Sequence, residues 1–147
     1  MVRTAVHLKL NCLWVSCQQA CGLMLADLLN KKFMANTVLK NFLQADEVRE
    51  FPYGRFEIVH LDGVSLGRAT YQPGWKWSQH NASLVGTALC HAPHKGVVLS
   101  GHGVVQYQDG ERLDLLPGMV FHISTVPHDS WVEGDQPYVS LHVLNLA

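Results

Sequence analysis

One short stretch of the chain brings together side chains that bind metal ions. Residues 86–101 read GTALCHAPHKGVVLSG, in which Cys90, His91 and His94 fall within five positions. If Cys90 ends one strand and His94 begins the next, the two side chains lie about 5 Å apart and can share one ion. His91 then points away from Cys90 and stays outside the cluster. The stretch therefore predicts part of a metal site.

The remaining ligands must come from other parts of the chain. The candidates are His128, which directly follows Pro127, and His80. A thiolate and several imidazoles suit zinc, iron, nickel or copper, whereas magnesium and calcium prefer oxygen ligands. We therefore predict a divalent transition metal, with zinc in first place. Its predicted ligands are His80, Cys90, His94 and His128.

Other interpretations of these side chains remain open at the level of sequence. Cys90 could be a small buried apolar residue, and the histidines could be core residues or the polar lining of a pocket. A Cys–His nucleophile is a further interpretation, but neither a helix N-terminus nor a clear orienting acid accompanies Cys90. The fold must show whether several of the nine histidines converge.

Three tryptophans flank the candidate ligands and predict a small-molecule pocket. Trp75 and Trp77 precede His80, and Trp131 follows His128. Aromatic walls around a polar centre are typical of such pockets, although core packing is the alternative for each tryptophan. The net charge is −1 and no basic cluster is present, so we expect neither a highly anionic ligand nor nucleic acid as a partner.

The first 33 residues differ from the rest and predict a separate extension. Leucines recur at near-helical spacing over residues 18–33, where we expect an amphipathic helix. Its apolar face would pack on a sheet or in a dimer interface; alternatively, Met34 is a second potential start. The segment is too short and interrupted to span a bilayer and lacks a clear signal cleavage site. We therefore predict a cytoplasmic protein without membrane association.

Residues 34–147 predict one β domain. Short apolar runs are separated by turns, among which Asp62-Gly63 and Asp109-Gly110 are strong hairpin signals. Many short strands without a helical period indicate an all-β sandwich or small barrel. We expect strands at residues 55–61, 64–71, 83–90, 94–99, 103–108, 111–115, 119–124, 129–132 and 138–146.

Two motifs within residues 71–132 resemble those of the cupin superfamily. HKGVVLSG is similar to the end of the first cupin motif, with His94 in the position of the usual glutamate. PGMVFHISTVPHDSWV is similar to the second motif, with His128 in the position of its histidine ligand. The paired histidines of the first motif are absent. One alignment, through PGWKWSQH, makes His80 a ligand, and the other places Cys90 on the second histidine position.

The chain resembles small bacterial single-domain cupins of unassigned activity more than any characterised cupin enzyme. This resemblance implies a jelly-roll β-barrel over about residues 48–146, a bound metal, a small organic ligand inside the barrel and a homodimer. The expected function is a metal-binding barrel that holds a small organic ligand, for which a metal-dependent enzyme of hydrolase, isomerase or dioxygenase type is one form. The alternatives are a non-catalytic binding or sensor module and a self-associating barrel without metal. Only an enzyme needs an exchangeable position beside about three protein ligands.

Overall fold

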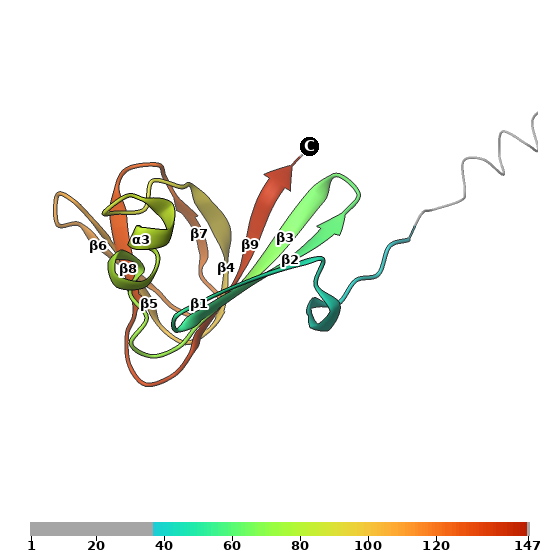
Figure 1. Cartoon of the computed structure of the whole chain (residues 1–147), viewed down its shortest axis with the longest axis horizontal. Coiled ribbons are helices and arrows are strands. Elements are labelled where there is room, and N and C mark those ends of the chain that lie inside the picture. The colour runs from blue at the N-terminus through green and yellow to red at the C-terminus, as the bar shows by residue number, and fades with distance from the viewer. Residues whose placement is uncertain (1–36, 147) are drawn as a thin grey trace, which may run out of the picture. The chain divides into compact units, whose positions relative to one another are not determined.

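Two antiparallel β-sheets make up residues 37–146, the part of the chain that the computed structural model describes (Figure 1). The larger sheet has the strand order β1-β2-β3-β9-β4-β7, and the smaller sheet has the order β6-β5-β8. The predicted all-β class is confirmed, whereas the predicted N-terminal helix and the boundary at residues 33 and 34 lie outside the described residues. The elements are η1 (Phe42–Gln44), β1 (Glu47–Phe51), β2 (Gly54–Leu61), β3 (Val64–Tyr71), α2 (Trp77–His80), α3 (Ala82–Val85), β4 (His94–Ser100), β5 (Gly103–Tyr107), β6 (Arg112–Leu115), β7 (Val120–Ile123), β8 (His128–Val132) and β9 (Tyr138–Leu146).

Two hairpins follow directly from Asp-Gly pairs in the sequence. β2 and β3 pair around Asp62-Gly63, and β5 and β6 pair around Asp109-Gly110. The two glycines have φ angles of 75° and 93°, a region that residues with a Cβ atom rarely adopt. Both hairpin predictions are therefore confirmed, although Asp62 and Asp109 have no positive φ angle, so the turns are not of type I′.

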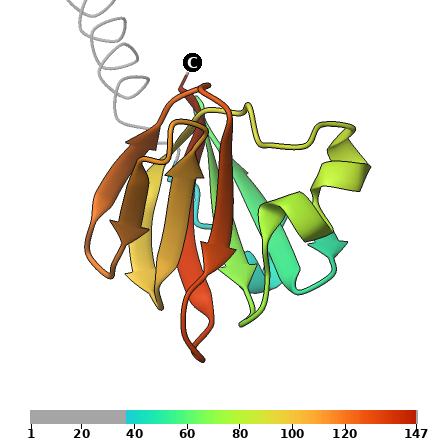
Figure 2. The same ribbon diagram turned by 90° about the vertical axis from the view of Figure 1, so that its left-hand side faces the viewer.

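Strands far apart in the sequence meet through β9 and β8. β9 lies between β3 and β4 in the larger sheet, and β8 pairs with β5 in the smaller one. Figure 2 shows the strands side by side and the two helical turns at their flank. This arrangement fixes the beginnings of β4 and β8, where His94 and His128 stand.

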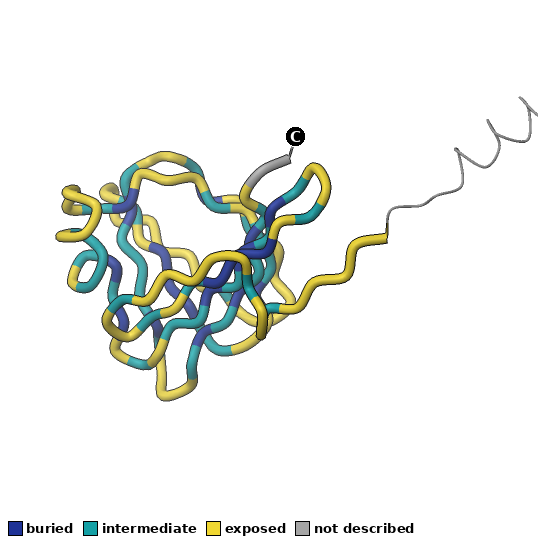
Figure 3. The backbone as a smooth tube through the Cα atoms, turned by 45° about the vertical axis from the view of Figure 1, so that its right-hand side comes forward, coloured by how far each residue is buried: buried dark blue, intermediate teal, exposed yellow. Residues whose placement is uncertain are grey.

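Apolar residues of both sheets form the core. Figure 3 marks the buried positions in dark blue along the backbone. The main cluster of buried residues is Trp75, Trp77, Cys90, Val98, Val132 and Tyr138. β4 and β9 approach so closely at Gly96 that a Cβ atom there would overlap the backbone carbonyl of Leu141. A glycine at this position of β4 therefore allows the tight packing of the strand that carries His94.

The predicted strand at residues 83–90 is wrong, because helix α3 covers its first residues and only Cys90 forms a β-bridge. α3 ends at Val85 and is capped by Gly86. Gly86 has a φ angle of 81° and donates a hydrogen bond to the Ala82 carbonyl at 2.8 Å. The first turn of α2 is held by Asp129 of β8. Its carboxylate accepts hydrogen bonds from the N–H and the hydroxyl of Ser78 at 3.0 and 2.8 Å.

Strand β1 was not predicted, because its residues do not alternate between buried and exposed. Four of its five residues are exposed, and its pairing with β2 along the sheet edge defines it. Within residues 37–146, no helix is long and apolar enough to cross a membrane.

Candidate metal centre

Cys90 and His128 lie opposite each other as an antiparallel backbone pair. The Cys90 N–H donates to the His128 carbonyl at 2.9 Å, and the His128 N–H donates to the Cys90 carbonyl at 3.1 Å. A second isolated bridge joins Lys76 to Trp131 further along β8. The segment with α2 and α3 therefore runs along the outer edge of β8 and meets that strand again at Cys90.

Three of the four predicted ligands converge at this point. One ligand atom each from Cys90, His94 and His128 can be chosen so that all three lie within 4.8 Å of one another. Cys90 Sγ and His94 Nε2 lie 3.3 Å apart. A tetrahedral zinc ion with bonds of about 2.0–2.3 Å keeps its ligand atoms roughly 3.5 Å apart. The observed spacing therefore fits three ligands of one ion.

A hydrogen bond from its Nδ1 atom to the backbone orients the His128 ring. Its Nδ1 atom lies 2.8 Å from the carbonyl of Val126, which can only accept, so Nδ1 carries the proton. The lone pair is then on Nε2, the atom free to bind an ion. Metal-binding histidines usually have such a partner on the other ring nitrogen. His128 is also only 1% exposed, so its position is well constrained.

Burial changes the protonation of the cluster in the absence of an ion. It lowers the pKa of His94 to about 4, with a further contribution from His128. The His94 ring is therefore neutral at pH 7 and can bind an ion. Burial also raises the pKa of the Cys90 thiol, whereas a divalent cation would favour the thiolate. This set of donors fits a divalent transition metal.

His80, the fourth predicted ligand, is not brought to this cluster. It ends α2, where its Nδ1 atom lies 3.0 Å from both the backbone nitrogen and the carbonyl oxygen of Lys76. Its ring packs against Tyr53 with centroids 5.0 Å apart. His91 is exposed, as its place between Cys90 and His94 predicted.

His142 is a residue near the site that the sequence analysis did not select. Its ring centroid lies 5.9 Å from that of His94 and 5.4 Å from that of Phe121. Its Nε2 atom is hydrogen-bonded to the Ser140 hydroxyl at 2.9 Å, and burial lowers its pKa to about 4. Alternation along β9 from the buried Tyr138 would have placed both Ser140 and His142 on the inner face.

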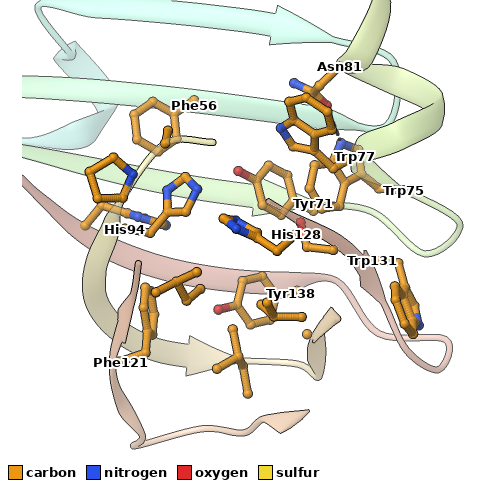
Figure 4. Close-up of a pocket in the computed structure, with 18 of the residues that line it drawn as sticks. Phe56, Tyr71, Trp75, Trp77, Asn81, His94, Phe121, His128, Trp131 and Tyr138 are labelled. Atoms are coloured by element: carbon orange, nitrogen blue, oxygen red, sulfur yellow. Dashed lines mark hydrogen bonds between the residues drawn. The ribbon is translucent and has the colours of Figure 1, made fainter. Parts of the chain in front are cut away.

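A cavity of about 540 Å³ adjoins the cluster, and Trp75, Trp77 and Trp131 all line it. Figure 4 shows His128 between this tryptophan-rich end and the end where His94 lies with Phe56 and Phe121. The volume is within the range of roughly 300–1,000 Å³ that is typical of small-molecule sites. His94 and His128 also line this cavity, so the candidate metal centre and the cavity adjoin each other.

No protein-family model matches the chain, and no curated protein sequence does so either. Solved structures do share its architecture. Ectoine synthase from P. lautus has a TM-score of 0.55 and 13% identity, over 75% of this chain and 78% of that chain. A sugar phosphate isomerase from a cupin superfamily, from Silicibacter pomeroyi, has a TM-score of 0.52 and 18% identity, over 71% and 74%.

A third similar structure is an uncharacterised conserved protein with a double-stranded β-helix domain from Klebsiella pneumoniae. It has a TM-score of 0.52 and 12% identity, over 77% of this chain and 88% of that chain. Identities this low concern the fold alone. Together with the two antiparallel sheets and their strand order, they show that residues 37–146 of this chain have the fold of the cupin superfamily.

Proposed function

We propose that this protein is a metal-binding cupin barrel in which Cys90, His94 and His128 hold one divalent transition metal ion. The observation that carries the proposal is the convergence of their ligand atoms within 4.8 Å. Sulfur and nitrogen ligands without a carboxylate favour zinc, followed by iron, nickel or copper. His80 could join this set only by leaving its contact with the Lys76 backbone.

Three protein ligands leave a position for a further molecule, as in catalytic zinc sites. A bound ion would supply Lewis-acid chemistry or, if it were iron, chemistry with dioxygen. We propose a metal-dependent enzyme of the hydrolase, isomerase or dioxygenase type. Two of the similar structures are an ectoine synthase and a sugar phosphate isomerase, so the fold supports more than one reaction and does not choose among them.

The second candidate function is a binding or sensor module without turnover. It is favoured by the aromatic lining of the cavity, which includes Trp75 and Trp77 and exists independently of a metal. In either case, the cavity would enclose a small organic molecule next to the metal ligands. Turnover of a bound molecule distinguishes the enzyme from the module.

Elemental analysis of the full chain, purified without an affinity tag, tests the proposal. We expect about one transition metal ion per chain, with zinc as the main element. The ion should be removed by prolonged dialysis against a chelator and restored by adding zinc. A protein that contains no metal and takes up none would contradict the proposal and leave the module without metal as the better account.

We also propose that the protein is a cytoplasmic homodimer. A reducing compartment suits a thiol that serves as a metal ligand.

Several large apolar side chains are exposed on the described domain, among them Val120, Leu39 and Leu43 at 83%, 90% and 83%, and a second copy could cover some of them. Light scattering should give twice the 16.4 kDa of one chain; a mass of one chain at micromolar concentration would refute the dimer.

A further inference from the structure

Within residues 37–146, no buried side chain of Asp, Glu, Lys or Arg lines the cavity. Three residues of these types line the cavity within residues 37–146, namely Arg49, Glu50 and Lys95, and all three are exposed. Arg49 is paired with Glu47 at 3.0 Å, and Glu50 is paired with Arg55 at 2.7 Å. A charged group on a molecule deep in this cavity would therefore find no side chain of fixed opposite charge.

The cavity walls are flat and apolar beside the metal ligands. Tyr71 stacks on Trp75, with ring centroids 3.8 Å apart and planes 7° apart, and lies nearly parallel to Tyr138, at 6.2 Å and 11°. Phe121 and Trp77 belong to the same aromatic lining, which Figure 4 displays. Such faces favour flat molecules, because aromatic rings pack best in offset or edge contacts. Among the lining residues, His94 and His128 are the two that belong to the proposed metal centre.

The proposed ligands give the metal centre a defined net charge. A divalent ion contributes +2, the Cys90 thiolate contributes −1, and metal-bound imidazoles of His94 and His128 are neutral. The net charge is therefore +1. One anionic group on a bound molecule would balance this charge. A second anionic group would remain uncompensated in an apolar cavity, and a cationic group would be repelled by the ion, so both would bind at a cost.

We propose that this cavity binds a small, flat, apolar molecule that carries a single anionic oxygen group, such as a carboxylate, an enolate or a phenolate. The anionic group faces Cys90, His94 and His128, and the flat body lies against Tyr71, Trp75 and Trp77. This inference rests on the proposed metal site, since the charge of the ion selects the anionic group. It narrows the ligand class from small organic molecules in general to monoanions with a flat body.

Isothermal titration calorimetry on the zinc-loaded full chain tests this selection with three probes of one shape. The probes are 2-naphthoate, 2,3-naphthalenedicarboxylate and 2-naphthalenemethanol, which carry one, two and no negative charges at pH 7. We expect 2-naphthoate to bind about tenfold more tightly than either of the others, which corresponds to about 1.4 kcal/mol. After the metal has been removed, 2-naphthoate should lose its advantage over the alcohol.

A variant of the ligand set provides a second arm. Cys90→His replaces the thiolate by a neutral imidazole and raises the net charge at the ion to +2. If this variant folds and loads zinc, the dicarboxylate should gain on the monocarboxylate. If the variant does not fold or does not load zinc, the wild-type series alone tests the proposal. A loaded wild-type protein that binds all three probes equally, or that prefers the alcohol or the dicarboxylate, overturns the proposal but leaves the metal site intact. A wild-type protein that binds no metal removes both proposals together.

Discussion

The Nε2 atom of His94 lies 3.3 Å from the Sγ atom of Cys90, although the two residues belong to different parts of the fold. His94 is the first residue of β4 in the larger sheet. Cys90 is attached to β8 of the smaller sheet through its backbone pairing with His128. An ion held by these three residues would therefore connect the two sheets at one end of the domain.

Removal of the metal should destabilise the domain, because the ion would bind the folded chain and not the unfolded one. At a free metal concentration one hundred times the dissociation constant, the expected stabilisation is about 2.7 kcal/mol. Thermal unfolding of the zinc-loaded chain before and after chelation measures this difference. Cys90→Ala is the matched variant, in which chelation should have little effect. An unfolding temperature that does not depend on metal in the wild type would argue against a site that joins the sheets.

The metal-free protein should lose stability as the pH falls below 6.5. Burial lowers the pKa values of His94 and His142 from 6.5 to about 4 in the folded chain. Between these values the unfolded chain binds more protons than the folded one, so stability falls as the pH falls through this window. Above pH 6.5 both histidines are neutral in the folded and the unfolded chain, so their burial causes no loss of stability there. Urea unfolding of the chelated protein at pH 7 and pH 5 measures the change.

Two variants separate buried from exposed histidines in this experiment. His142→Gln removes one buried titrating group while keeping a polar partner for Ser140, and should reduce the loss of stability between pH 7 and pH 5. His91→Ala removes an exposed imidazole and should leave the loss as it is in the wild type. Equal pH dependence in all three proteins would show that burial of histidine is not its cause.

The proximity of three predicted ligands and the positions of two hairpins could be predicted from local patterns in the sequence. Cys90 and His94 stand close together in the chain, and the second motif points to His128, so their spacing predicted a cluster. The structure brings the three together. Asp-Gly pairs likewise predicted the hairpins at Gly63 and Gly110, because a positive φ angle is a property of a single residue.

The parts that the sequence did not predict depend on contacts between distant residues. The turn at Ser78 is stabilised by Asp129, which is remote in the sequence. Helix α3 follows this turn, whereas the apolar pattern of residues 83–90 suggested a strand. His80 is the last residue of the motif-like PGWKWSQH, but its ring lies against Lys76 and Tyr53 at the end of α2. His142 was not selected because the inner face of β9 becomes certain only when its neighbouring strands are known.

Asp129→Ala should destabilise the domain by about 1–2 kcal/mol, because it removes the oxygen atoms that hold the first turn of α2. The Asp129 carboxylate also lies 3.3 Å from the Lys76 ammonium group, so one carboxylate stabilises two neighbouring groups. Urea unfolding measures the loss. Asp135→Ala is the matched control, because Asp135 is exposed, and its effect should stay within about 0.5 kcal/mol. Similar losses in both variants would disprove the capping role.

His94→Ala should remove most of the bound metal, whereas His91→Ala should leave the metal content unchanged. Both variants delete one imidazole from the same five residues, but only His94 places a ligand atom within reach of Cys90 and His128. His80→Ala should also keep its metal, because the His80 ring is held at the Lys76 backbone. Elemental analysis of the tag-free variants, with circular dichroism to establish that each is folded, makes the comparison. Equal metal content in the His94→Ala and His91→Ala proteins would mean that His94 is not a ligand, and loss of metal in His80→Ala would mean that His80 completes the site as the sequence predicted.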